Sequence, residues 1–227
     1  MKIAALLPMK GHSERVPGKN FKMLGHKPLF RWMLDTLSRS ELIEQIIVNT
    51  DAASELTEAG LTPGEGDDAK VLLRNRRAEL VGDMISMNLV IADDIENIEA
   101  DLYLMTHVTN PFISLKTVES AIQSFEKKPS ADSLFAVNKF QTRFYSGNGD
   151  PINHDPDNLI RTQDLEPWYE ENSCLYLFTR SSFAATQARI GKAPILFETP
   201  RLESVDIDEP EDWSLAEALS ITMFAHV

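Results

Sequence analysis

Cysteine is almost absent from this chain, which has a single one, Cys174, among its 227 residues. A lone cysteine allows no internal disulfide. Long hydrophobic runs are also absent, because no apolar stretch approaches the ~20 residues that a helix needs to cross a bilayer. The N-terminus shows no basic and then apolar leader of the secretory kind. Together these absences predict a cytoplasmic protein that has no place in a membrane.

Positive charge is scarce: 22 Lys and Arg residues stand against 35 Asp and Glu residues, for a formal net charge of −13. A surface of this charge repels nucleic-acid phosphates and anionic membranes, so neither is an expected partner. If such a chain binds a nucleotide, its basic groups must be concentrated at the site, or a divalent cation must screen the phosphates.

Apolar residues make up 43% of the sequence, enough for the packed core of one α/β domain that spans residues 1–227. Apolar runs typical of buried strands alternate with segments of helical periodicity. The expected strands are 3–7, 46–49, 70–73, 101–106, 132–137, 172–178 and 195–198. One expected helix begins after Pro28, and the others cover 84–98, 115–127, 183–190 and 215–224.

The loop at 8–20 follows the first expected strand and precedes the first expected helix. It holds Lys10, Arg15 and Lys19, and Gly11 and Gly18 let its backbone bend. A strand, a loop with glycine and lysine, and then a helix is a common phosphate-binding arrangement in α/β proteins. The loop matches neither the Walker pattern nor the dinucleotide fingerprint. An ordinary connection with solvated lysines is the alternative.

Two carboxylates near the C-terminus form a second candidate site. In an extended segment Asp206 and Asp208 lie on one face, with Ile207 opposite. Two carboxylates this close repel each other unless a cation lies between them, and hard oxygen ligands suit Mg²⁺. The alternative is an acidic segment before a helix whose first residue is Pro210.

Other polar positions have both a structural and a functional interpretation. Asp51 follows the second strand, and we expect it to cap the next helix. Arg76 follows the third strand in a basic turn that either binds phosphate or is solvated. His107 follows the fourth strand and either contacts a ligand or is a structural histidine. The polar segment 139–168 has no helical period.

Residues 8–20 resemble, without a gap, the signature loop of the acylneuraminate cytidylyltransferases, the CMP-sialic acid synthetases. That loop usually reads Pro-Ala-Arg-Gly-Gly-Ser-Lys-Arg-Ile-Pro-Arg-Lys-Asn. The shared residues are Pro8, Gly11, Ser13, Arg15, Pro17, Lys19 and Asn20. Departures include Lys10 for Arg, His12 for Gly, Glu14 for Lys and Gly18 for Arg.

Further segments resemble the same family in the same order along the chain. Arg76 and Asp83 match its Arg-Pro-x-x-Leu-x-x-Asp segment, although Arg77 replaces the proline. Thr109 matches its Gln-Pro-Thr-Ser-Pro segment, where His107 replaces Gln. The later matches are Asn172, Tyr176 and Phe178 in Asn-Gly-Ala-x-Tyr-x-Phe, and Asp206 with Asp208 in Asp-x-Asp.

The resemblance implies a three-layer α/β/α nucleotidyltransferase domain of Rossmann-like type, with a mainly parallel sheet. It also implies that 139–168 is a protruding dimerisation arm, so we expect a homodimer. The implied catalytic residues are Lys19 and Asp208, and the implied Mg²⁺ ligands are Asp206 and Asp208. The implied nucleotide-binding residues are Lys10, Gly11, Ser13, Arg15, Asn20, Arg76 and Asp83. The implied sugar-binding residues are His107, Thr109, Arg143, Arg161 and Asn172.

The expected reaction transfers CMP from CTP to the anomeric hydroxyl of an acidic nine-carbon sugar and releases pyrophosphate. The sugar is of the sialic, legionaminic or pseudaminic type. One alternative is an enzyme like the CMP-Kdo synthetases, whose loop shares Pro17, Gly18 and Lys19, although Asn20 and the 161–178 segment argue against it. Another alternative is a nucleotide-binding protein without catalytic activity.

Overall fold

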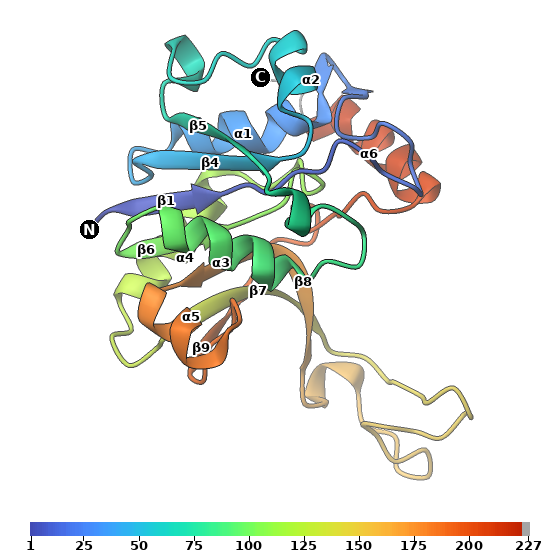
Figure 1. Ribbon diagram of the computed structural model, residues 1–227. Coiled ribbons are helices and arrows are strands. Elements are labelled where there is room, and N and C mark those ends of the chain that lie inside the picture. The colour runs from blue at the N-terminus through green and yellow to red at the C-terminus, as the bar shows by residue number, and fades with distance from the viewer. Residues whose placement is uncertain (224–227) are drawn as a thin grey trace.

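The computed structural model describes residues 1–223 and consists of a central sheet covered on both faces by helices (Figure 1). The sheet has seven strands in the order β5-β4-β1-β6-β8-β7-β9. They are β1 (Ile3–Leu6), β4 (Gln45–Thr50), β5 (Val71–Asn75), β6 (Leu102–Met105), β7 (Ser133–Phe140), β8 (Trp168–Phe178) and β9 (Pro194–Glu198). A separate hairpin pairs β2 (Met23–Leu24) with β3 (Lys27–Pro28).

The α-helices connect these strands, and short 3₁₀ turns lie between them. The helices are α1 (Leu29–Arg39), α2 (Ala53–Glu58), α3 (Met87–Asn97), α4 (Leu115–Glu126), α5 (Arg180–Thr186) and α6 (Pro210–Met223). The turns are η1 (Gly66–Asp68), η2 (Ala78–Leu80) and η3 (Thr162–Asp164). Among residues 1–223, no helix combines the length and the apolar character that crossing a membrane requires.

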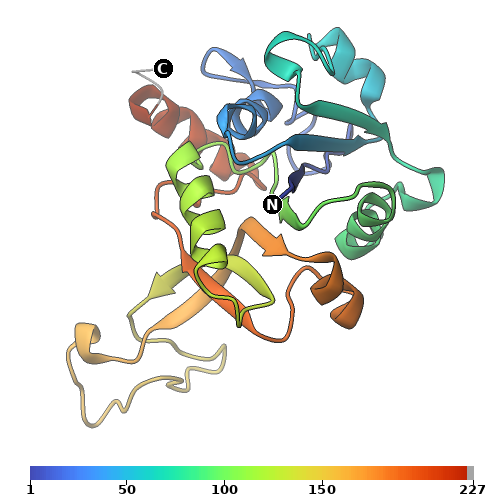
Figure 2. The ribbon, with the colours of Figure 1, turned by 90° about the vertical axis from the view of Figure 1, so that its left-hand side faces the viewer.

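Each face of the sheet packs against helices through its own hydrophobic cluster, so the domain has three layers (Figures 1 and 2). Side chains alternate along a strand, so Ile3 and Ala5 of β1 face one layer and Ala4 and Leu6 face the other. The first layer contains α1, α2 and α4, and the second contains α3 and α5. The expected α/β/α architecture is therefore confirmed.

Most neighbouring strands are parallel, as expected for this class of fold. β1 pairs in parallel with β4 and β6, and β4 pairs in parallel with β5. β8 is the exception, since it runs antiparallel to both β6 and β7. The carboxyl ends of the parallel strands β1, β4 and β6 therefore meet at one edge, where ligands bind in open α/β sheets.

Helix boundaries differ from the sequence expectation where capping residues decide them. α3 begins at Met87 rather than at residue 84, because the Ser86 side chain accepts a hydrogen bond from the Asn88 amide. α5 begins at Arg180, directly after its N-cap residue Thr179, which forms a capping box with Ser182. It ends before Gln187, which takes a left-handed conformation. The helix expected at 215–224 begins earlier, at Pro210, and its last expected residue lies outside the described part of the chain.

The segment expected to leave the sheet does so. β7 and β8 pair as far as Phe140 and Trp168, and residues 141–167 extend away from the domain between them (Figures 1 and 2). The register of the pair shifts between Phe135 and Val137. We call residues 141–167 the arm.

Candidate functional site

A cavity of about 540 Å³ opens at the carboxyl ends of β1 and β6. Its walls come from the loop at 8–20, from the segment after β6 and from the segment before α6. Of the residues predicted from the sequence, those that line it are Lys10, Ser13, Arg15, Lys19, Asn20, Asp83, His107, Thr109, Asp206 and Asp208. Segments that are up to 200 positions apart in the chain therefore share one cavity.

The loop at 8–20 is held against the end of β4. The Gly11 amide donates a hydrogen bond to Asp51 Oδ1 at 2.7 Å. A Cβ atom on Gly11 would lie 2.7 Å from the Cβ of Ala52, so the contact requires glycine. The prediction that Asp51 caps α2 is wrong, because the N-cap residue is Ala52 and no side chain makes a capping hydrogen bond there. Asp51 instead fixes the loop.

Lys19 is the most buried cation of the cavity, with 8% of the residue exposed. Its Nζ donates to the Ile207 carbonyl at 2.6 Å and to Asp208 Oδ1 at 3.0 Å. Arg15 reaches the other side of the same carboxylate, with 3.1 Å between its Nη2 and Asp208 Oδ2. Although burial acts to raise it, these two cations hold the pKa of Asp208 below its ordinary value. Asp208 is therefore ionised at neutral pH.

Asp206 has a different environment from Asp208. Its Oδ1 is buried and has no hydrogen-bond partner within residues 1–223. Burial raises the pKa of Asp206, and the negative charge of Asp208 adds to the effect. A polar interaction with the Thr109 side chain acts in the opposite direction on the pKa of Asp206. A buried carboxylate oxygen without a partner is an acceptor that a bound cation would satisfy.

The donor set at the two aspartates fits Mg²⁺. Within residues 1–223, no group of three or more His, Cys, Asp or Glu residues is placed to hold a metal ion. Mg²⁺ is commonly held by one or two carboxylates and completes its shell with substrate phosphates and water. Asp206, with its unpaired oxygen, and Asp208 in the same cavity supply that number.

Lys10 and Asn20 also belong to the wall of the cavity that the loop at 8–20 forms. Lys10 Nζ pairs with Asp83 Oδ1 at 2.9 Å, which joins the loop to the segment before α3. The Asn20 side chain donates to the Lys10 carbonyl at 2.8 Å and so fixes the loop against itself. Gly11, a predicted nucleotide-binding residue, does not line the cavity.

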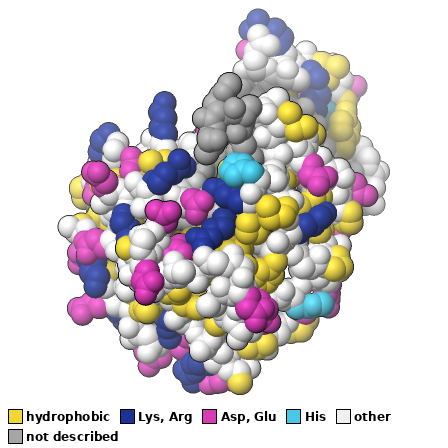
Figure 3. All heavy atoms as spheres, turned by 90° about the horizontal axis from the view of Figure 1, so that it is seen from above, with side chains coloured by type: hydrophobic (Ala, Val, Ile, Leu, Met, Phe, Trp, Pro, Cys, Tyr) yellow, Lys and Arg dark blue, Asp and Glu magenta, His cyan; other side chains and the backbone are white. Residues whose placement is uncertain are grey.

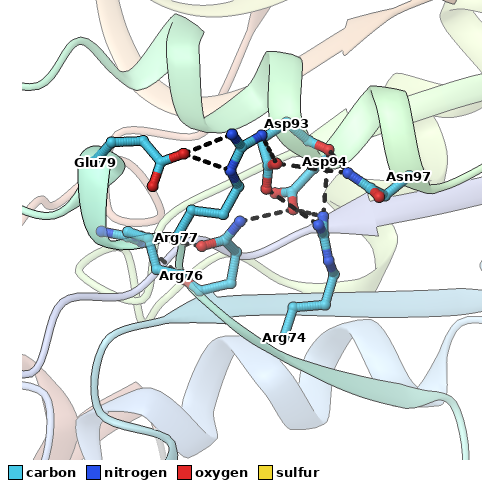
Figure 4. Close-up of polar contacts among 8 residues, drawn as sticks. Arg74, Arg76, Arg77, Glu79, Asp93, Asp94 and Asn97 are labelled. Carbon is cyan, nitrogen blue, oxygen red and sulfur yellow. Dashed lines mark hydrogen bonds and ion pairs between the residues drawn. The ribbon is translucent and has the colours of Figure 1, made fainter.

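Arg76 lies outside the cavity lining. Its guanidinium is buried and donates to the Met9 carbonyl, to the Asn49 carbonyl at 2.7 Å and to Asn49 Oδ1 at 3.0 Å. Beside it, Arg74 of β5 pairs with Asp93 and Asp94 of α3 (Figure 4). In this structure Arg76 supports the start of the loop from behind.

His107 faces the cavity from the end of β6. Burial lowers the pKa of its imidazole to about 4, and the positive charges of Arg189 and Lys19 contribute in the same direction. At neutral pH the ring is therefore uncharged and can both donate and accept one hydrogen bond.

The remaining predicted sugar-binding residues do not line the cavity of this chain. Arg143 donates to the Ile160 carbonyl at 2.6 Å, and Arg161 pairs with Asp164, all within the arm. Asn172 is buried, and its side chain bonds Asn138 and Thr199.

Arg189 and Ser173 line the cavity but were not predicted from the sequence. Ser173 has a positive φ of 60°, and it stands where the family's Asn-Gly-Ala segment has glycine, a signal that could have indicated this backbone conformation. Arg189 follows the short helix α5. From the sequence it fell inside an expected helix at 183–190, and that pattern gave no reason to place its side chain at a ligand.

The cavity combines charged groups of both signs. Three cations of the loop line the cavity together with the two aspartates, and Lys19 and Arg15 directly contact Asp208. Elsewhere, on the face seen in Figure 3, Lys and Arg side chains lie among Asp and Glu side chains rather than apart from them. A cavity that combines lysine, arginine and a pair of carboxylates can hold a polyphosphate.

Comparison with known proteins agrees with this geometry. The model of the cytidylyltransferase family matches residues 4–225. The chain is 26% identical over 235 residues to the CMP-N,N'-diacetyllegionaminic acid synthase of Legionella pneumophila, with 96% of each chain covered. It is 27% identical over 223 residues to the N-acylneuraminate cytidylyltransferase of Oncorhynchus mykiss, covering 95% of this chain and 49% of that relative. This chain thus spans about half the length of the second relative.

The fold is also found in solved structures. A CMP:2-keto-3-deoxy-manno-octonic acid synthetase complexed with CTP superposes with a TM-score of 0.65 at 15% identity. The match covers 97% of this chain and 99% of that one. Since the family model covers nearly the whole chain, the protein belongs to the cytidylyltransferase family, as a nucleotidyltransferase of the acylneuraminate cytidylyltransferase type.

Proposed function

We propose that this enzyme transfers CMP from CTP to the anomeric hydroxyl of an acidic nonulosonic sugar. The anomeric oxygen forms a bond to the α-phosphorus, the bond from that phosphorus to the bridging oxygen of the β-phosphate breaks, and pyrophosphate leaves. The hydroxyl proton is released. The observation that carries the proposal is the 3.0 Å contact of Lys19 with Asp208, which joins the loop after β1 to the acidic segment before α6.

The residues of the cavity act by position and charge. Lys19, Arg15 and Lys10 offset the negative charge of the triphosphate, and Asn20 and Gly11 keep the loop that carries them in one shape. Phosphoryl-type transfers depend on alignment and charge stabilisation more than on covalent steps by the protein. Ser13 and Asp83 complete the nucleotide side of the cavity.

Asp206 and Asp208 are the residues that would hold Mg²⁺. When bound, the ion supplies charge stabilisation at the α-phosphate and the leaving pyrophosphate. Asp208 is kept ionised by Lys19 and Arg15. Thr109 lines the same cavity and favours the ionised form of Asp206.

The sugar occupies the part of the cavity near His107 and Thr109. The uncharged His107 ring suits a sugar hydroxyl or amide, which need a donor or an acceptor rather than a charge. Asn172 acts on this side from behind the wall, because it is buried beside Ser173. A sugar of the sialic, legionaminic or pseudaminic type is supported by the names of relatives that are a legionaminic acid synthase, an N-acylneuraminate cytidylyltransferase and a pseudaminic acid cytidylyltransferase.

We further propose a cytoplasmic homodimer in which the arms meet. The arm carries exposed apolar side chains, and its Arg143 and Arg161 lie in it rather than at the cavity of their own chain. These two arginines are candidates for the cavity of the partner subunit. The single buried cysteine is compatible with a reducing compartment.

Pyrophosphate release from CTP with Mg²⁺ and a panel of acid sugars tests the proposal. The panel contains sialic, legionaminic and pseudaminic acids and the eight-carbon acid Kdo. We expect release with a nine-carbon acid and none without a sugar. Turnover with Kdo alone would overturn the assignment in favour of a CMP-Kdo synthetase. CTP binding without turnover on any sugar would identify a nucleotide-binding protein.

A further inference from the structure

Arg189 is a cation of the cavity that does not come from the nucleotide-binding loop. Lys10, Arg15 and Lys19 all belong to residues 8–20, whereas Arg189 lies between α5 and β9 and reaches the cavity from the β8 side. It enters the lining together with Ser173 of β8. A positive charge therefore stands on the side of the cavity that the triphosphate-binding loop does not occupy.

The guanidinium of Arg189 is held by two residues of β8. Its carbon lies 4.0 Å from the centre of the Tyr176 ring, a stacked cation–π contact. One nitrogen lies 3.5 Å from Glu171 Oε1. Glu171 also accepts a hydrogen bond from the Tyr176 hydroxyl, so the ring and the carboxylate form one support. A guanidinium fixed in this way presents its remaining donors in a set direction.

The loop cations have closer carboxylate partners than Arg189. Lys10 pairs with Asp83 at 2.9 Å, Lys19 with Asp208 at 3.0 Å, and Arg15 with Glu209 at 2.8 Å. At 3.5 Å, the contact of Arg189 with Glu171 is at the limit of a hydrogen bond. Arg189 and His107 both line the cavity. The positive charge of Arg189 helps to lower the pKa of the half-buried His107.

We propose that Arg189 binds the carboxylate of the acid sugar and makes this enzyme specific for acids over neutral sugars. The inference rests on the proposed function, and it assigns the carboxylate to a residue of the same chain. Arginine binds a carboxylate through two parallel hydrogen bonds, which lysine cannot reproduce. Neutral His107 beside it adds a hydrogen bond without adding charge. Arg143 and Arg161, the sequence candidates for this role, lie in the arm, where Arg143 donates to the Ile160 carbonyl and Arg161 pairs with Asp164, and neither lines the cavity of its own chain.

The test compares the sugar dependence of Arg189→Gln, Arg189→Lys and the wild type, by steady-state pyrophosphate release. Loss of a charge-assisted carboxylate contact predicts a rise of about ten- to a hundredfold in the KM for the sugar in Arg189→Gln. The KM for CTP should stay within about twofold, because the loop cations are untouched. Arg189→Lys should recover part of the loss, since it keeps the charge but not the fork.

A modified substrate makes the test independent of folding effects. The methyl ester of the same sugar lacks the negative charge, so the wild type should lose about ten- to a hundredfold in kcat/KM on it. Arg189→Gln should treat acid and ester alike within about threefold. The matched control is Lys192→Gln, which removes one positive charge three residues away at an exposed position outside the cavity. It should discriminate as the wild type does.

The outcomes separate this inference from the proposed function. A wild type that releases no pyrophosphate with any sugar overturns the proposed function, and the inference falls with it. An active wild type with unchanged acid-over-ester discrimination in Arg189→Gln overturns the inference alone. Loss of discrimination in Arg143→Gln or Arg161→Gln, with Arg189→Gln unaffected, also overturns it and assigns the carboxylate to the arm.

Discussion

Gly11 shows how the absence of one side chain sets the shape of the loop at 8–20. Its amide bonds Asp51 at 2.7 Å, and an added Cβ would lie only 2.7 Å from the Cβ of Ala52. Gly11→Ala must therefore push the loop away from β4. We expect a stability loss of about 1–3 kcal/mol and a KM for CTP raised about tenfold, measured by urea denaturation and by steady-state kinetics.

Gly147 provides the matched control, because an added Cβ there would meet no atom within 4 Å. Gly147→Ala should leave both quantities near the wild-type values. Equal effects of the two substitutions would contradict the account of the loop.

His107 predicts a pH dependence of stability. Burial lowers its pKa to about 4 in the folded chain, against 6.5 as the ordinary value. Between these values the unfolded chain binds a proton that the folded chain does not, so stability rises with pH and is lost as pH falls from about 6.5 towards 4. His107→Gln should remove this contribution. The free energy of unfolding, measured in urea at pH 7 and pH 5, should fall less in the variant than in the wild type. An equal or larger fall in the variant would show that the imidazole is not buried in its neutral form.

At the scale of elements, the arm carries several apolar side chains that are exposed in the single chain. Its exposed apolar side chains include Leu159 at 62% and Ile160 at 45%. Burial of such side chains against a second copy would stabilise a dimer. Leu159→Ser combined with Ile160→Ser should convert a dimer to a monomer, as followed by light scattering at several protein concentrations.

The control for the arm is Ile221→Ser, on the outer side of α6, where the side chain is 75% exposed. This variant should keep the wild-type mass. A wild type that is monomeric throughout, or a double variant that stays dimeric, would contradict the role of the arm.

The sequence predicts long periodic elements better than short ones. The buried strands were expected close to their observed places because continuous apolar runs mark them. The hairpin of β2 and β3 was missed, since each strand has only two residues and no period can be read from two. The early start of α5 depends on the capping box of Thr179 and Ser182, a local signal that the apolar pattern of 183–190 conceals.

At the scale of the whole molecule, the resemblance of separate segments to one family predicted which residues meet. Lys19 and Asp208 come together although 189 positions separate them. Arg76 was expected at the nucleotide, but sequence cannot tell a side chain that lines a cavity from one that supports its wall. Arg189 was not expected at all, because its place depends on stacking against Tyr176 and not on any spacing.

The most direct test of the central claim measures pyrophosphate release from CTP and the best acid sugar in Lys19→Met and Asp208→Asn. Both residues belong to one cavity, so each variant should lose at least about a hundredfold in kcat while far-UV circular dichroism stays that of a folded chain. The matched controls Lys22→Met and Glu211→Gln, whose residues lie outside the cavity lining, should remain near the wild-type rate. Near-normal release by a folded Lys19→Met or Asp208→Asn would contradict the claim that the loop and the acidic pair act together on one CTP.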